Sequence, residues 1–350
     1  MKKVFVGVSG GVDSSVSAAL LKDKGYDVTG VFIKVWQPDF IECNWKDEMR
    51  DAMRVCAKLD IPFLLCDLEK DYKEGVVDYM IEEYKIGRTP NPDVMCNKEV
   101  KFKAFLNFAL EKGVDYIATG HYAQNIKKED YFSLYESKDK EKDQTYFIWN
   151  VNQKILKKTL FPIGHLKKEE VRDIARKKNL LTSDKKDSQG LCFIGHIDMK
   201  DFLKRFIDTK PGKVLNEKGE IVGKHSGSIL YTIGERHNFE IFQKVYNEKI
   251  YYVTSKNLDK NTITISENKK NYDSKIIKLD NVSLTRKIEF ENTEIEARIR
   301  YRQPLSKAKI KHYSKSELTI EFNELQNSVT SGQSLVIYKN GECLGGGVIV

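Results

Sequence analysis

The chain has 350 residues, of which 40% are hydrophobic, and this length is sufficient for two or three domains that each bury a core. Lysine and arginine (59) outnumber aspartate and glutamate (51), and the resulting net charge of +8 favours a polyanionic partner, although a lysine-rich composition alone also produces such a charge. The six cysteines form no C-x-x-C pair, which argues against a zinc ribbon or a disulfide framework and favours a reducing cytoplasm. We expect neither secretion nor a membrane span, because the chain has no signal-peptide core and no apolar run of about 20 residues.

Strand and helix patterns alternate through the first part of the chain. Strands are expected at residues 2–8, 28–35, 62–68 and 115–119, and helices at residues 14–24, 46–59, 72–85 and 100–112. This alternation predicts an α/β fold with a doubly wound parallel sheet, in which ligands bind at the carboxyl ends of the strands.

Short alternating segments with turn residues between them replace this pattern beyond about residue 210. They are residues 213–222, 250–254, 262–266, 294–300, 308–311, 318–322 and 335–338. They predict β-rich domains, and we place domain boundaries near residues 205 and 280, which divide the chain into 1–205, 206–280 and 281–350.

A glycine-rich loop follows the first expected strand. Its sequence is Ser9-Gly10-Gly11-Val12-Asp13-Ser14-Ser15. The glycines allow a sharp turn with inward N–H groups, and the polar side chains can supply hydroxyl contacts, a helix N-cap and a carboxylate for a metal ion. No Walker lysine follows, so the loop resembles the PP-loop of enzymes that cut ATP between the α- and β-phosphates. The alternative is an ordinary strand-to-helix turn.

Two further segments carry cysteines in polar surroundings. In the proline-containing segment 87–97, Asp93 precedes Cys96 by three residues, and Lys98 next to a helix start could favour a thiolate at Cys96. Cys192 lies in a second polar segment, and two thiols brought together by the fold could transfer sulfur through a persulfide and close to a disulfide. The alternative for each is an inert loop or core cysteine.

The motifs together resemble those of the tRNA-specific 2-thiouridylases (MnmA/TrmU family) over nearly the whole chain. They are residues 7–15, 87–93, 96–102, 118–122, 142–147, 186–188, 190–195, 231–234, 300–303 and 344–347. The resemblance implies a PP-loop catalytic domain, a small β-rich central domain and a C-terminal β-barrel domain. Residues 235–238 depart from the family's usual Gln-Arg-Lys-Gly, since Glu235, Arg236, His237 and Asn238 stand there.

The resemblance also implies roles for individual residues. Cys96 corresponds to the nucleophile, Cys192 to the persulfide carrier, and Asp93 would carry protons. The implied ATP-binding residues are Gly7, Val8, Ser9, Gly10, Gly11, Val12, Asp13, Ser14, Ile33 and Gly120. The implied tRNA-binding residues are Asn91, Pro92, Asp93, His121, Lys142, Asp143, Gln144, Arg300, Tyr301 and Gln333.

The implied activity is that of a cytoplasmic tRNA-uridine 2-sulfurtransferase, which adenylates the C2 oxygen of the wobble uridine and replaces it with persulfide sulfur. Its partners would be ATP with Mg²⁺ as substrate, the Lys, Glu and Gln tRNAs, and a persulfide donor such as a cysteine desulfurase or a sulfur-relay protein. Neither a permanent cofactor nor a protein-bound metal is expected. Base access requires that the uridine be flipped out of the anticodon stack.

Two other functions are compatible with parts of this pattern. A PP-loop ligase that forms an amide or amidine on a small molecule would use the same loop but no cysteine pair. A catalytically silent tRNA-binding homologue would keep the fold without releasing pyrophosphate.

Overall fold

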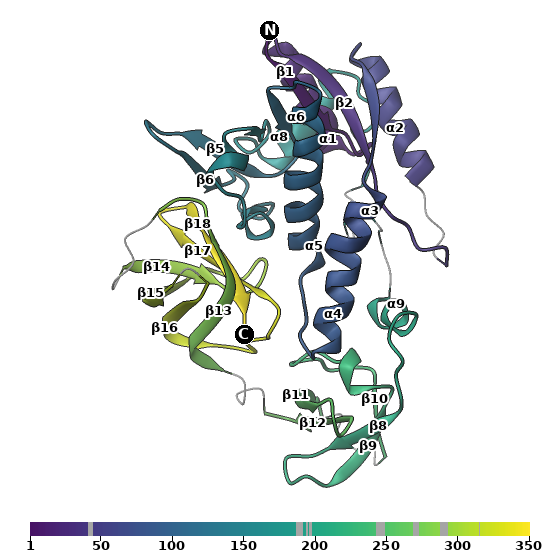
Figure 1. Cartoon of the computed structure of the whole chain (residues 1–350), viewed down its shortest axis with the longest axis vertical. Coiled ribbons are helices and arrows are strands. Elements are labelled where there is room, and N and C mark those ends of the chain that lie inside the picture. Colours follow the sequence, from purple (N-terminus) through teal and green to yellow (C-terminus); the bar gives the residue numbers. More distant parts are fainter. Residues whose placement is uncertain are drawn as a thin grey trace.

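The structure is a computed structural model that describes residues 1–40, 45–186, 192, 193, 195, 198–242, 249–268, 273–287, 293–314 and 316–350. Cys43 and motif residues 187–191 and 194 therefore lie outside the described residues. Figure 1 shows the three parts of the chain: a sheet with helices at the N-terminal end, a small sheet formed by the middle of the chain, and a barrel that contains the C-terminus. The α/β class and the two β-rich parts expected from the sequence are confirmed.

The first sheet is parallel, and its central strands β1 and β4 and most of β2 are buried. Its strands are β1 (Lys3–Gly7), β2 (Asp27–Lys34), β3 (Phe63–Asp67), β4 (Tyr116–Ala118) and β7 (Thr159–Leu160), in the order β3-β2-β1-β4-β7. Val4 and Val6 pack with side chains of α1 (Val12–Asp23) and α2 (Trp45–Lys58), whereas Phe5 belongs to a cluster with α6 (Phe105–Glu111). Helices therefore cover both faces, as near-continuous apolar strands require.

Two helical rods lie against each other near the centre of the molecule (Figure 1), and each contains a π-helical segment. One consists of α3 (Glu69–Tyr72), the π-helix Lys73–Asp78 and α4 (Tyr79–Lys85). The other consists of α5 (Pro92–Met95), the π-helix Cys96–Ala104 and α6. The helices expected at 72–85 and 100–112 are present but begin earlier, and their π-helical segments were not expected.

The segment after β4 links the first part of the chain to the barrel. It forms a hairpin of β5 (Ala123–Lys127) and β6 (Phe132–Glu136), the 3₁₀ helix Thr145–Phe147, and α7 (Gln153–Leu156). Strand β6 pairs with the barrel strand β18 (Glu342–Ile349), with Tyr135 opposite Glu342 and Leu134 opposite Cys343. Helices α8 (Lys168–Lys177) and α9 (Met199–Lys204) follow β7.

The middle sheet has the order β10-β9-β8-β12-β11. Its strands are β8 (Gly212–Leu215), β9 (Ile221–His225), β10 (Phe239–Ile241), β11 (Tyr252–Asn257) and β12 (Thr262–Ser266). The 3₁₀ helix Ser228–Leu230 lies between β9 and β10. Tyr231 and Val253 belong to the same buried cluster as the helical rods, so this sheet packs against the first part of the chain.

The C-terminal strands close into an antiparallel barrel. They are β13 (Ser274–Leu284), β14 (Glu294–Arg298), β15 (Ser306–Tyr313), β16 (Leu318–Gln326), β17 (Ser334–Lys339) and β18. The barrel closes where β13 pairs with both β16 and β18. The domain boundaries at 205 and 280 stay predictions. None of the helices within the described ranges is long and apolar enough to cross a membrane.

Candidate active site

The glycine-rich loop connects β1 to α1 at the carboxyl edge of the parallel sheet. Gly10 has a φ of +70°, and a Cβ there would lie 2.6 Å from the backbone oxygen of Glu48, so glycine satisfies both the turn and the close approach of α2. Gly11 is the N-cap of α1, and no side chain caps the helix. The expected side-chain N-cap is thus wrong, because the hydroxyls of Ser14 and Ser15 donate instead to the Gly11 carbonyl at 3.2 and 2.7 Å. The N-terminus of α1 keeps backbone donors suited to an anion.

Asp13 in the first turn of α1 forms an ion pair that sequence reasoning missed. The ammonium group of Lys168 lies 2.9 Å from each Asp13 carboxylate oxygen, and the Tyr122 hydroxyl donates to Oδ1 at 2.9 Å. Lys168 is the first residue of α8, where a cation is opposed by the helix dipole. A lysine at the start of a helix is unfavourable, and this was the signal in the sequence that an acidic partner lies nearby. That partner is the Asp13 carboxylate, which offsets the charge of Lys168.

The other predicted ATP-binding residues surround the same edge of the sheet. Gly120 follows β4, and a Cβ there would lie 2.7 Å from the Ser14 nitrogen, so the chain passes directly against the start of α1. A Cβ on Gly7 would lie 3.8 Å from Cδ1 of Ile33, which places the ends of β1 and β2 side by side. Val8 and Val12 are buried in core clusters, and Ser9 hydrogen-bonds through its backbone N–H to Ser14 Oγ at 3.2 Å.

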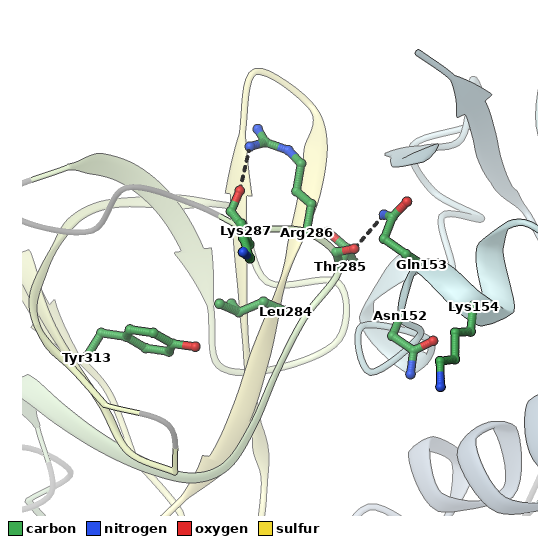
Figure 2. Close-up of a pocket in the computed structure, with 8 residues that line it drawn as sticks. All are labelled: Asn152, Gln153, Lys154, Leu284, Thr285, Arg286, Lys287 and Tyr313. Atoms are coloured by element: carbon green, nitrogen blue, oxygen red, sulfur yellow. Dashed lines mark hydrogen bonds between the residues drawn. The ribbon is translucent and has the colours of Figure 1, made fainter. Parts of the chain in front are cut away.

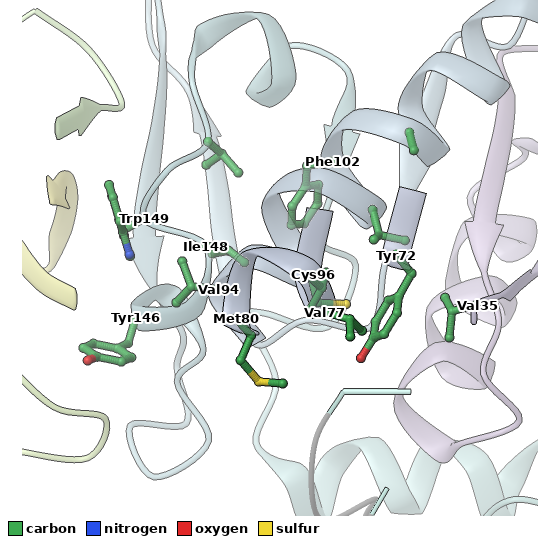
Figure 3. Packing of buried hydrophobic residues seen from close by; sticks show 14 of the residues in the cluster. Val35, Tyr72, Val77, Met80, Val94, Cys96, Phe102, Tyr146, Ile148 and Trp149 are labelled. Carbon is green, nitrogen blue, oxygen red and sulfur yellow. The ribbon is translucent and has the colours of Figure 1, made fainter. Parts of the chain in front are cut away.

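The two cysteines singled out from the sequence lie together. The Sγ atoms of Cys96 and Cys192 are 3.2 Å apart, and both cysteines are free thiols. Cys96 opens the π-helical segment and is fully buried, and Figure 3 shows it among the side chains of Tyr72, Val77 and Phe102. Cys192 is partly buried. This separation allows direct sulfur exchange between the two residues.

Three separate segments hold the backbone around Cys192. Its N–H donates to Oδ1 of Asp93 at 3.0 Å, and its carbonyl accepts a hydrogen bond from the Tyr72 hydroxyl at 2.8 Å. The amide of Gln37 donates to the Phe193 carbonyl at 3.1 Å. Asp93 is thus both close to the thiols and a positioning residue for Cys192, and sequence reasoning did not identify Tyr72 or Gln37.

The electrostatics of the thiol pair differ from the sequence-based expectation. Lys98 is exposed and lies 3.5 Å from Glu99, so it is not the cation that acts on Cys96. Burial, and then Cys192, hold the pKa of Cys96 well above its ordinary value. The pKa of Cys192 is lowered by the hydrogen bond from Cys96 and, against the effect of burial, by Lys101. The expectation of a favoured thiolate at Cys96 is therefore wrong, and Cys192 is the more acidic thiol.

Asp93 is itself perturbed in the direction that suits proton transfer. Burial raises the pKa of its carboxyl, while the hydrogen bond from the Cys192 N–H and the charge of Lys101 oppose that rise. A carboxyl whose pKa moves toward neutrality exchanges protons more readily at physiological pH.

Several predicted tRNA-binding residues hold the loop that carries Asp93 in place. Asn91 caps α5 by accepting hydrogen bonds from the backbone of Asp93 and Val94 at 3.2 and 3.3 Å, and Pro92 is the first helical residue. Gln333 donates from the barrel side to the carbonyls of Thr89 and Pro90 at 2.7 and 3.3 Å. The barrel is thereby attached to the loop that carries Asp93.

A second group of these predicted tRNA-binding residues lies where the 3₁₀ helix Thr145–Phe147 meets the barrel. The rings of Tyr301 and Phe147 have centroids 4.5 Å apart, and Arg300 is exposed and donates to the Ser328 carbonyl at 2.7 Å. Lys142 and Gln144 precede this 3₁₀ helix in the chain. Lys142 is partly exposed, and Gln144 accepts a hydrogen bond from the Tyr122 N–H at 2.9 Å.

His121 and Asp143 lie inside the protein. The His121 ring nitrogens contact Thr119 Oγ1 at 2.8 Å and Asn97 Oδ1 at 3.1 Å. Asp143 is 1% exposed and accepts hydrogen bonds from Ser137 and Thr145. Direct contact of these two side chains with RNA would need a rearrangement of their neighbours, and the role of both stays a prediction.

A pocket of about 720 Å³ lies elsewhere, between α7 and the barrel (Figure 2). It is lined by Asn152, Gln153, Lys154, Leu284, Thr285, Arg286, Lys287 and Tyr313. None of these residues belongs to the loop or the thiol pair, so the pocket is separate from the candidate active site.

Comparisons with known proteins cover nearly the whole chain. Family models described as the tRNA methyl transferase HUP domain, the tRNA methyl transferase PRC-barrel domain and the aminomethyltransferase β-barrel domain match residues 2–196, 200–267 and 274–349. A protein of Streptococcus agalactiae named tRNA-specific 2-thiouridylase MnmA is 44% identical over 99% of this chain and 95% of its own length. A protein of the same name from Streptococcus thermophilus is 45% identical with the same coverage.

The solved structures are more distant. A 4-thiouridine synthetase bound to RNA and ATP has a TM-score of 0.39 and 17% identity, and the match covers 58% of this chain and 50% of that one. At this level the likeness carries no argument about the site.

Proposed function

The chain belongs to the family of tRNA-specific 2-thiouridylases, and we propose that it converts the wobble uridine of tRNA to 2-thiouridine at the site formed by the glycine-rich loop and the two thiols. The observation that carries this proposal is the 3.2 Å separation of the Cys96 and Cys192 sulfurs, because a persulfide mechanism needs a carrier thiol and a second thiol within reach of it.

Adenylation is the first step. The backbone N–H groups of the loop and the N-terminus of α1 bind the phosphates of ATP, while the uridine C2 oxygen attacks the α-phosphorus and pyrophosphate leaves. Mg²⁺ would bind mainly to the phosphates and water, as this ion commonly does, and Asp13 is the carboxylate of the loop that could reach it. Within the described ranges no three acidic, histidine or cysteine side chains form a metal cluster.

Sulfur transfer is the second step. The terminal sulfur of a Cys192 persulfide bonds to C2 as AMP leaves, and Cys96, which loses its thiol proton as it attacks, bonds to Sγ of Cys192 and breaks the persulfide S–S bond. In the other order, Cys96 attacks first and releases hydrosulfide, which then attacks C2. In both orders the transferred sulfur is reduced, and the two cysteines are oxidised to one disulfide. Asp93 would carry the protons.

The partners follow from the same proposal. Lys, Glu and Gln tRNAs would bind across the loop at 91–93, the 142–144 segment and the barrel residues Arg300, Tyr301 and Gln333. The sulfur would come from a donor persulfide, and the enzyme would act in the cytoplasm. Affinity for tRNA should fall steeply with salt, because basic side chains displace cations from the phosphates.

The test is mass analysis of tRNA nucleosides after incubation with ATP, Mg²⁺ and a persulfide donor. We expect 2-thiouridine from the wild type and from Cys56→Ser, which changes a buried thiol of α2, but none from Cys96→Ser or Cys192→Ser. Peptide mapping without reductant should find Cys96 linked to Cys192 after one turnover. Undiminished thiolation by Cys192→Ser would refute the proposal, and pyrophosphate release that does not depend on tRNA would indicate a different acceptor.

A further inference from the structure

Lys101 faces the thiol pair because of the π-helical segment. Cys96 and Lys101 are five residues apart, which in an α-helix would place their side chains about 140° apart around the axis. The segment Cys96–Ala104 is instead a π-helix, whose wider turn pairs residues i and i+5 and brings Lys101 back to the face of Cys96. Wide turns of this kind inside α-helices are frequent at functional sites.

The ammonium group of Lys101 interacts with the reactive residues from this position. It acts on the sulfurs of Cys192 and Cys96 and on the carboxyl of Asp93, and it lies 5.3 Å from the centre of the Phe193 ring. These partners raise the pKa of Lys101 even though burial opposes its charge, so it is a cation at neutral pH.

The other titratable groups that face the pair do not supply a positive charge. Burial, with Lys101 as a lesser cause, keeps the pKa of His121 well below its ordinary value, so that ring is neutral. Burial likewise holds the pKa of Tyr72 well above its ordinary value. Asp93 on α5 opposes a negative charge on either sulfur. In the part of the chain that the structure describes, Lys101 is therefore the cation that acts on the two thiols.

We propose that Lys101 is a positioning residue, whose ammonium group holds one negative charge on the Cys96–Cys192 pair and keeps Cys192 ready to accept sulfur. This inference rests on the proposed function for its role in turnover. A Cys192 thiolate attacks the terminal sulfur of a donor persulfide, the S–S bond of the donor breaks, and the donor cysteine leaves as a thiolate. An isolated charge on a buried group is costly, so the negative charge on the thiol pair and the positive charge of Lys101 stabilise each other.

The experiment measures alkylation of Cys192 by iodoacetamide as a function of pH, with mass spectrometry of the modified peptide and without ATP or tRNA. We expect Lys101→Met to move the midpoint upward by about one pH unit or more, which corresponds to about tenfold slower alkylation below the midpoint. Lys101→Arg, which keeps the charge, should restore a midpoint near that of the wild type. Lys103→Met is the matched control, because Lys103 is 66% exposed and pairs with Glu99.

An unchanged midpoint in Lys101→Met would overturn the inference. If that variant does not fold, as judged by its thermal unfolding, Lys101→Gln and Lys101→Arg are compared in the same way, and equal midpoints for these two would overturn it. The result is distinguishable from a failure of the proposed function, because alkylation needs neither nucleotide nor RNA. A shifted midpoint in an enzyme that makes no 2-thiouridine would support the role of the charge and refute the proposed reaction.

Discussion

Asp93 and Cys192 are 99 positions apart in the chain, yet Oδ1 of Asp93 accepts a hydrogen bond from the backbone N–H of Cys192 at 3.0 Å. The residue expected to move protons therefore also fixes the segment that contains Cys192. These two roles can be separated, because an asparagine oxygen can accept the same hydrogen bond but an amide cannot carry a proton between reactants.

Asp93→Asn should therefore keep the thiols together and lose turnover. We expect thiolation to fall about 10²-fold or more, which is the usual contribution of a general acid or base. Mild oxidation should still link Cys96 to Cys192 at the wild-type rate. Asp93→Ala, which also loses the hydrogen bond, should slow this linkage. If Asp93→Asn thiolates tRNA normally, Asp93 only positions Cys192.

The same carboxyl should make the folded protein less stable as pH rises. Burial raises the pKa of Asp93 above 3.8, so the folded state binds its proton more tightly than the unfolded state does. Stability then falls as pH rises from about 3.8 through the raised pKa. Asp93→Asn should remove this loss, and its melting temperature relative to the wild type should be higher at pH 7 than at pH 4. If the difference in melting temperature between the two proteins does not change with pH, burial does not raise the pKa of the Asp93 carboxyl.

The strands and the glycine-rich loop were predictable because their signals are local. Short apolar runs and a Gly-Gly turn depend on neighbours within a few residues, and β1, β2, β3 and β4 lie where those patterns predicted them. The resemblance to the family, rather than spacing, indicated that Cys96 and Cys192 would meet.

Features that depend on distant partners were not predictable in the same way. The hairpin of β5 and β6 is stabilised by pairing with β18, about 200 positions later, and its own short segments are too polar to signal a buried strand. The ion pair of Asp13 with Lys168 spans 155 positions. The π-helical turn that rotates Lys101 toward Cys96 has no known signal in residues 96–104, so the sequence points to the adjacent Lys98 as the nearby cation instead.

Lys168→Met should weaken ATP binding. The Lys168 ammonium group neutralises Asp13 beside the glycine-rich loop, and without it the carboxylate would repel phosphates bound there. Repulsion between two unit charges about 4 Å apart is about 1–4 kcal/mol, which is about tenfold or more in affinity. Calorimetric titration with ATP measures the change, and Lys167→Met is the control, because its exposed side chain precedes the helix. Equal affinities for the two variants would contradict the role of Lys168.

Glu235, where the family usually has glutamine, forms an ion pair with Lys200 of α9. Helix α9 follows the segment that contains Cys192. The Glu235 carboxylate pairs with the Lys200 ammonium, with side chains 18% and 16% exposed, and also accepts a hydrogen bond from the Thr232 N–H at 3.1 Å. The Thr232 hydroxyl in turn contacts that of Thr89 at 3.2 Å, just before the Asp93 loop. The chain between the 3₁₀ helix Ser228–Leu230 and β10 thus contacts both segments that lead to the thiols.

Lys200→Met should reduce the free energy of unfolding by about 1–3 kcal/mol, because it leaves a largely buried carboxylate without its cation. Lys200→Met combined with Glu235→Gln, which introduces the amide usual in the family, should lose less than the sum of the two single changes. Denaturant unfolding of all four proteins gives this coupling energy, expected at about 0.5–3 kcal/mol for residues in contact. The exposed pair of Lys204 with Asp201 is the control and should couple by less than about 1 kcal/mol. If the Lys200 pair couples no more strongly than this surface pair, the carboxylate at 235 does not hold α9 in place.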